Sequence, residues 1–187
     1  VLGGDGTSRA FVKGWRQATL VALSTGTNNV FPQLIEAAIA GAALGLIAAG
    51  RVKPDEVTDV AKIIDIEITG EPNDVALIDA VVTSERFVGA RALLEPAMLQ
   101  AMLLSRADPA AVGMTSVGGL LAPLGAADAG GVYLKMGKGK HCVSAPISPG
   151  VYRNVNIESF RHVTFSERLS MVGPCVVALD GERERVI

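Results

Sequence analysis

The sequence predicts an α/β domain followed by an all-β domain, that is, a partial Rossmann-like parallel sheet with helices and then an antiparallel β-sandwich. Three observations favour this class. Hydrophobic residues make up 49% of the 187 residues, enough for a substantial core. Apolar strand-like and helix-like stretches alternate in residues 1–58. Short alternating strands separated by Gly- or Pro-containing turns fill residues 59–187, with one inserted helix, and their number and spacing fit a β-sandwich or a partly closed barrel.

The first domain is expected to contain two strand–helix units. "VLGG" (1–4) reads as the end of a strand, and 8–17 as a short helix. "TLVALSTG" (19–26) reads as a buried strand with its loop, and 33–49 as a long apolar helix. The uncharged run 37–50 is too short to span a bilayer, so we expect a buried helix. Two such units do not complete a doubly wound domain, and we expect further strands outside this sequence.

The second domain begins with a clear alternation. In 62–69, three isoleucines point to one face and polar side chains to the other, which is typical of a half-buried antiparallel strand. Turn residues at 70–73 lead into the next strand, 74–83. A helix is predicted from Pro96, because apolar residues recur at helical spacing through 103. Lysines in "KMGKGKH" (135–141) could contact phosphates, but a solvated hairpin tip is the better interpretation.

Composition narrows the partners to small molecules. The formal net charge is −2 and aromatic residues make up 4%, which disfavours nucleic acid and anionic membranes. Cys142 and Cys175 are the only cysteines and form no CxxC pair, so we expect free thiols in a reduced, cytoplasmic compartment. The adjacent His141 and Cys142 have no second ligand pair, and no protein metal site is predicted.

The segment "GGDGT" (3–7) is the first candidate site. Glycines let several backbone N–H groups turn toward an anion, and such nests bind phosphate. Asp5 would repel phosphate unless it binds Mg²⁺ or accepts a hydroxyl proton, as phosphoryl transfer requires. A tight strand-to-helix turn in which Asp5 caps the helix explains the same residues equally well.

Two further polar segments follow the same logic. "STGTNNVF" (24–31) also follows a strand and precedes a helix, so its hydroxyls and amides would share a crevice with Asp5 at the strand ends. A polar loop that caps the next helix is the alternative. In "PNDVALIDAVV" (72–82), Asn73 and Asp74 stand where a turn becomes a strand, and turn chemistry alone accounts for them.

Taken in order, "GGDGT", "GTNNVF" and "NDVALIDAVV" resemble the superfamily of NAD kinases and diacylglycerol-type lipid kinases. "ALDGERE" (178–184) is similar to the DG[EQ] element of the superfamily's last strands. The combination with "PISPG" and "RFVGARAL" looks most like the AcoX-type, ATP-NAD-kinase-like proteins of acetoin catabolism. NAD kinases also carry a GSTAY-like segment that shapes the NAD pocket. The nearest stretch of this sequence is 113–125, and the match is poor.

The resemblance implies a role for each matching residue. Asp5 would be the catalytic carboxylate that activates the acceptor hydroxyl. Asn73 and Asp74 would hold a ribose or adenine. The remaining nucleotide-binding candidates are the phosphate cradle Gly3, Gly4, Gly6 and Thr7, the loop residues Thr27 and Asn29, and the weaker candidates Asp180 and Glu182. An Asp-Gly pair also suits a β-turn for its own reasons.

The implied activity is phosphorylation of NAD to NADP, with ATP or polyphosphate as donor and Mg²⁺ as cofactor, in a cleft between the two domains of a homo-oligomeric enzyme. Two alternatives stay open at this point. The chain could be a catalytically silent nucleotide-binding module associated with acetoin catabolism, which the poor GSTAY match favours. It could also be a lipid kinase, as "GTNNVF" suggests, although the sequence has no amphipathic or basic membrane surface.

Overall fold

The computed structural model describes residues 1–85 and 95–187, with the side chains of all of these except 183 and 184. The motif "RFVGARAL" (86–93) lies outside the described residues. The chain divides into two compact units, Val1–Ala61 and Lys62–Ile187, whereas the sequence placed the boundary after residue 58. Each unit is described by itself.

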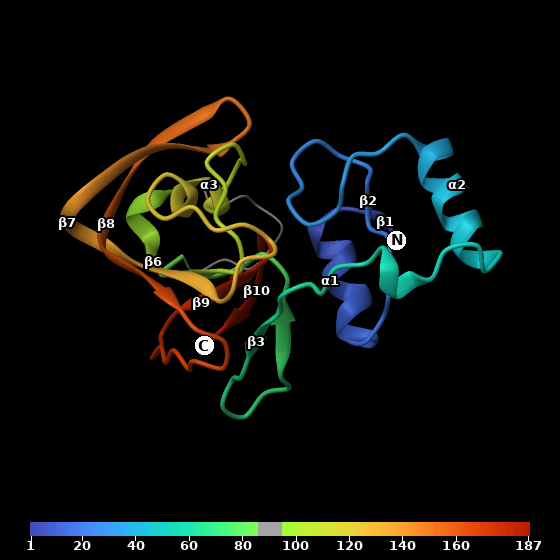
Figure 1. Ribbon diagram of the computed structural model, residues 1–187. Coiled ribbons are helices and arrows are strands. Elements are labelled where there is room, and N and C mark those ends of the chain that lie inside the picture. The colour runs from blue at the N-terminus through green and yellow to red at the C-terminus, as the bar shows by residue number, and fades with distance from the viewer. Residues whose placement is uncertain (86–94) are drawn as a thin grey trace. The chain divides into compact units, whose positions relative to one another are not determined.

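The first unit contains a small parallel sheet and two helices (Figure 1). Leu2 and Gly3 of β1 (Leu2–Gly3) pair in parallel with β2 (Leu23–Ser24), so the predicted strand 19–26 is only two residues long. The helix α1 (Asp5–Gly14) begins directly after β1, and α2 (Ala37–Ala48) follows the loop after β2. A short 3₁₀ turn, η1 (Pro54–Glu56), completes the unit.

The apolar helix α2 is not the buried helix that the sequence predicted. Ala40 is its one buried residue, while Ile39, Leu44 and Leu46 are 65%, 43% and 51% exposed. The helix forms because alanines and leucines favour it, and Glu36 caps it by accepting the N–H of Ile39 at 3.0 Å. Residues 1–61 supply two short strands, which is little surface to cover a helix that is apolar on every side.

The second unit is built on one antiparallel sheet of six strands in the order β10-β9-β5-β6-β7-β8. The predicted sandwich of two facing sheets is therefore replaced, in the described residues, by a single large sheet and a separate pair, β3 with β4. The bounds of the strands are β3 (Ile64–Ile66), β4 (Asp74–Ala76), β5 (Asp79–Thr83), β6 (Leu99–Leu104), β7 (Gly131–Ser148), β8 (Val151–Val163), β9 (Val176–Leu179) and β10 (Glu182–Val186).

The sheet curves around a short helix, α3 (Met114–Gly119), as Figure 1 shows for the long ribbon of β7 and β8. Every residue of α3 is buried. Val117 packs in the main core cluster with Val132, Leu134 and Ile157 from the sheet. The glycine- and hydroxyl-rich stretch 113–125 thus contributes the centre of this unit's core, because its small residues fit inside a strongly curved sheet.

The predicted helix from Pro96 is wrong. Pro96–Met98 forms a single 3₁₀ turn, η2, and the chain then continues as the strand β6 between β5 and β7. Leu99, Met102 and Leu104 are buried. A central strand covered on both faces is apolar along most of its length, so its hydrophobic pattern also fits a helix.

The segment "KMGKGKH" is a bulge inside β7 and not a hairpin tip. Met136 and His141 both pair with Ile157 of β8, so the four residues between them bulge out of the ladder. A side chain at Gly139 would come within 2.5 Å of the Ile157 carbonyl oxygen, which explains the glycine. The hairpin turn instead lies between Ser148 and Val151.

The two cysteines lie in different surroundings, which gives a direct test of the packing. Cys142 is exposed on β7, whereas Cys175 is buried just before β9, and burial raises the pKa of its thiol. Because the thiolate is the reactive form, iodoacetamide should modify Cys142 quickly and Cys175 only after denaturation. Peptide mass spectrometry of the native and unfolded protein measures both rates. Equal native rates would contradict the burial of Cys175.

Across the part of the chain that the structure describes, no helix combines the length and apolar character needed to cross a membrane.

Candidate functional site

The first candidate site joins the turn at Asp5 to the loop 24–31, as the sequence predicted for two loops at the ends of parallel strands. Asp5 Oδ1 accepts the backbone N–H of Val30 at 3.1 Å and that of Phe31 at 2.7 Å. Its Oδ2 accepts the Val30 N–H at 3.0 Å. The carboxylate therefore binds the second loop directly through its backbone.

Asn29 makes the reciprocal contact from the loop to the turn. Its Oδ1 accepts the backbone N–H of Asp5 at 3.4 Å, and its Nδ2 donates to Ser24 Oγ at 2.7 Å. Ser24 Oγ in turn donates to the carbonyl of Gly26 at 2.7 Å. Asn29 thus connects the end of β2, its following loop and the start of α1 in one half-buried network.

The glycines of the turn have a packing reason. A side chain on Gly3 would come within 2.5 Å of Thr7 Oγ1, and one on Gly4 would come within 2.7 Å of Asn29 Oδ1. The sequence predicted that these glycines let a ligand come close to the backbone. In the structure the side chains of Thr7 and Asn29 occupy the space beside them. Gly6 is half-buried, and Thr7 and Thr27 are exposed to solvent.

The carboxylate of Asp5 binds the loop 24–31 and does not occupy the N-cap position of α1. The N-cap of α1 is Gly4, which supplies no side chain for capping, and Asp5 is the first residue of the helix itself. Its carboxylate points to the neighbouring loop. A carboxylate that accepts these N–H groups fastens two loops together, which is a structural use of the motif.

The same contacts bear on the expected Mg²⁺. Mg²⁺ prefers several oxygen ligands in near-octahedral geometry. Both oxygens of Asp5 accept backbone N–H groups, and the described residues form no group of three or more His, Cys, Asp or Glu side chains that could hold a metal. Asp5 as placed does not fit a Mg²⁺ ligand.

The second pair of candidates, Asn73 and Asp74, lies in the second unit. The side chain of Asp74 is fully buried, and its Oδ2 pairs with Arg185 Nη2 at 3.2 Å. Glu71 lies 3.9 Å from Nε of the same arginine. Asn73 is exposed just before β4. Asp74 is therefore held in a partly buried ion pair, and of the two residues Asn73 is the one open to solvent.

Asp180, a weaker candidate in the sequence, accepts hydrogen bonds from three consecutive backbone N–H groups. It is buried and accepts the backbone N–H groups of Leu77, Ile78 and Asp79 at 2.7–3.2 Å. It also occupies a left-handed backbone conformation, with φ of 50°, before Gly181 at φ of 82°. The Asp-Gly turn and the carboxylate together join the β9–β10 hairpin to the segment between β4 and β5. Glu182 is exposed at the start of β10.

Sequence reasoning missed Arg185, the partner of Asp74. The two residues are 111 positions apart, and a single arginine in the charged tail "ERERVI" carries no local signal for that pairing. Of the candidate residues, the structure thus brings Asp5 and Asn29 together, in the first unit. Asn73, Asp74, Asp180 and Glu182 belong to the other unit.

The chain is a two-unit protein of mixed α and β structure. Its first unit has paired glycine- and amide-rich loops, and its second unit is built on a curved antiparallel sheet. Residues 62–187 match the acetoin catabolism protein X C-terminal domain, and the chain belongs to this family. Along 193 aligned residues it is 41% identical to acetoin catabolism protein X of Cupriavidus necator, which covers 98% of this chain and 54% of that protein. The chain thus spans about half the length of the curated relative that it matches. No solved structure matches it.

Proposed function

We propose that this chain forms part of a cytoplasmic, homo-oligomeric phosphotransferase of acetoin catabolism that phosphorylates NAD to NADP. ATP or polyphosphate would be the phosphoryl donor, and it would bind as its complex with Mg²⁺. The name of the 41% identical relative supports the link to acetoin catabolism. The order of the sequence motifs supports phosphoryl transfer.

One observation carries this proposal furthest. The "GGDGT" turn and the "GTNNVF" loop, which are far apart in sequence, meet at the same end of β1 and β2 through Asp5 and Asn29. The exposed hydroxyls of Thr7 and Thr27 lie in these two segments. Neutral donors on loops at the carboxyl ends of parallel strands suit the binding of a nucleotide phosphate.

The test is NADP formation by the full-length protein with NAD, Mg²⁺ and either ATP or polyphosphate, followed with an NADP-specific dehydrogenase. We expect turnover with one of the two donors. Asp5→Asn should lower kcat by at least about a hundredfold if Asp5 takes the hydroxyl proton. Asp55→Asn, an exposed acid of the same unit, is the matched control and should keep full activity. No turnover with any donor would overturn the proposal.

A second candidate function follows from the contacts of Asp5. Because its carboxylate fastens the loop at Val30 and Phe31, it has a structural use that needs no catalysis. This favours a nucleotide-binding module that performs no phosphoryl transfer and acts in acetoin catabolism as a sensor or assembly partner. The exposed loops would then bind the nucleotide without changing it.

The two candidates are separated when binding is measured as well as turnover. A silent module should bind ATP or NAD in calorimetry and form no NADP. Asp5→Asn would then weaken binding and lower the melting temperature together, because the loop 24–31 loosens. The loop would loosen in the same way in an enzyme, so NADP formation by the unchanged protein separates the two candidates, and Asp5→Asn would then lower kcat as well as affinity.

A further inference from the structure

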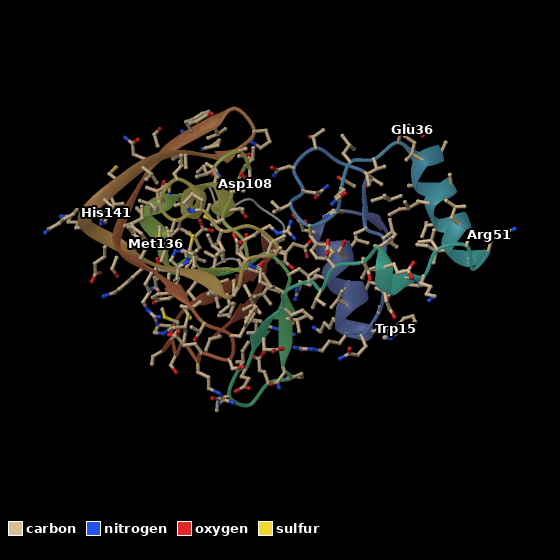
Figure 2. All side chains as sticks on the ribbon, in the orientation of Figure 1. Trp15, Glu36, Arg51, Asp108, Met136 and His141 are labelled. Carbon is tan, nitrogen blue, oxygen red and sulfur yellow. The ribbon has the colours of Figure 1, made fainter. Side chains whose placement is uncertain are left out.

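A pocket in the second unit is lined by none of that unit's candidate residues Asn73, Asp74, Asp180 and Glu182. Its volume is about 330 Å³, and its walls are the segments 106–109 and 123–128. The two walls are joined by a pair of backbone hydrogen bonds between Ala107 and Leu124, at 2.8 and 2.9 Å. Asp108, labelled in Figure 2, belongs to the first wall.

The second wall is held in place by polar contacts. Lys62 Nζ donates to the carbonyl oxygens of Gly125 at 3.0 Å and Asp128 at 2.9 Å. Asp128 Oδ2 accepts the backbone N–H of Gly125 at 2.7 Å. The loop 123–128 is therefore fixed from outside by a lysine and from within by an aspartate. A pocket whose walls are already ordered loses less conformational entropy when it binds a ligand.

The lining combines apolar surface with a guanidinium group. Pro109 and Pro123 supply its exposed apolar surface, since Ala107 and Leu124 are buried, and Arg106 is the one cationic residue of the lining. Lys62 lies behind the second wall: burial and the charge of Arg106 lower the pKa of its ammonium, and Asp128 raises it. A guanidinium carries five N–H donors, so it can bind a ligand in addition to partners within the protein.

The acids of the lining are engaged by the backbone. Asp108 Oδ1 accepts the N–H of Ala110 at 2.8 Å, and Asp128 Oδ2 accepts that of Gly125. Their remaining charge disfavours a highly charged polyanion at this site. The volume lies at the low end of small-molecule sites, which are about 300–1,000 Å³.

We propose that this pocket binds a small organic anion, a carboxylate or phosphate monoester with a compact apolar body, whose charged group contacts Arg106. The apolar walls bind the body, and the planar guanidinium forms paired hydrogen bonds with the two oxygens of the anion. The site is independent of the proposed phosphotransferase activity, because it uses none of the residues in that proposal.

Titration of the ¹⁵N-labelled full chain with benzoate or with phenyl phosphate tests this directly. We expect saturable chemical-shift changes of the backbone amides of Ala107, Gly125 and Ala126. Sodium chloride at equal ionic strength should produce no such changes. The tighter of the two probes identifies the carboxylate or the phosphate as the preferred group. Shifts that rise linearly with concentration, or that appear equally with chloride, would overturn the proposal.

Two variants make the test specific. Arg106→Met should weaken the binding of the tighter probe by about tenfold or more, since a charge-assisted hydrogen bond is lost. Arg168→Met, an arginine 83% exposed in the same unit, should leave affinity unchanged. Ala126→Leu fills the pocket while keeping Arg106, so it should abolish binding even if Arg106→Met does not fold. Unchanged affinity in Ala126→Leu would overturn the assignment.

Discussion

Replacing Asp180 by alanine is expected to destabilise the second unit by about 3–5 kcal/mol. The substitution leaves the backbone N–H groups of Leu77, Ile78 and Asp79 without the carboxylate that accepts them, and a buried donor without an acceptor costs about 1–3 kcal/mol. Alanine also tolerates the left-handed conformation at this position poorly. Urea unfolding followed by circular dichroism measures the loss.

The neighbouring acid provides the control for Asp180. Glu182→Gln changes an exposed side chain of β10, and its effect should stay within about 0.5 kcal/mol. Asp180→Asn keeps one oxygen acceptor and should fall between the two. If Asp180→Ala proved as stable as Glu182→Gln, the carboxylate would not be the connection between the β9–β10 hairpin and the segment before β5.

The second large effect is expected for Gly119→Ala at the end of α3. A methyl group there would overlap the backbone atoms of Asp108 and Pro109, which cannot move aside as a flexible side chain can. Overpacking of this kind costs about 1–3 kcal/mol and occasionally more, and we expect about 3 kcal/mol. The same unfolding experiment measures it.

The adjacent glycine is the matched control. In Gly118→Ala the added methyl group meets the side chain of Leu104, which can change rotamer, so a smaller cost is expected. Both positions are buried in the same helix. A larger loss for Gly118→Ala than for Gly119→Ala would show that α3 does not pack against the 108–109 backbone as described.

The sequence predicted the approach of the "GGDGT" and "GTNNVF" segments but not what Asp5 does there. The approach follows from two loops at the ends of adjacent parallel strands, which is a matter of topology. The partners of Asp5 are backbone N–H groups of Val30 and Phe31, and every residue other than proline has one. No choice of side chain at those positions could have revealed the contact.

Other differences arise where local pattern and tertiary packing disagree. The strand Leu99–Leu104 reads as a helix because both of its faces are covered in the sheet. The helix Ala37–Ala48 reads as buried because it is apolar all round, yet the unit that contains it covers little of it. Arg106 and Lys62 gained significance only when the segments 106–109 and 123–128 formed one pocket and Lys62, distant in sequence, bound the second of them.

The order of strands in the large sheet has a consequence for biosynthesis. β5 lies between β6 and β9, so Ala80 pairs with Leu179 about a hundred residues later. The middle of the sheet is therefore incomplete until residues 176–179 have been synthesised, and such non-local pairing slows folding. Until then one edge of β5 has no partner strand, and an unpaired strand edge promotes aggregation.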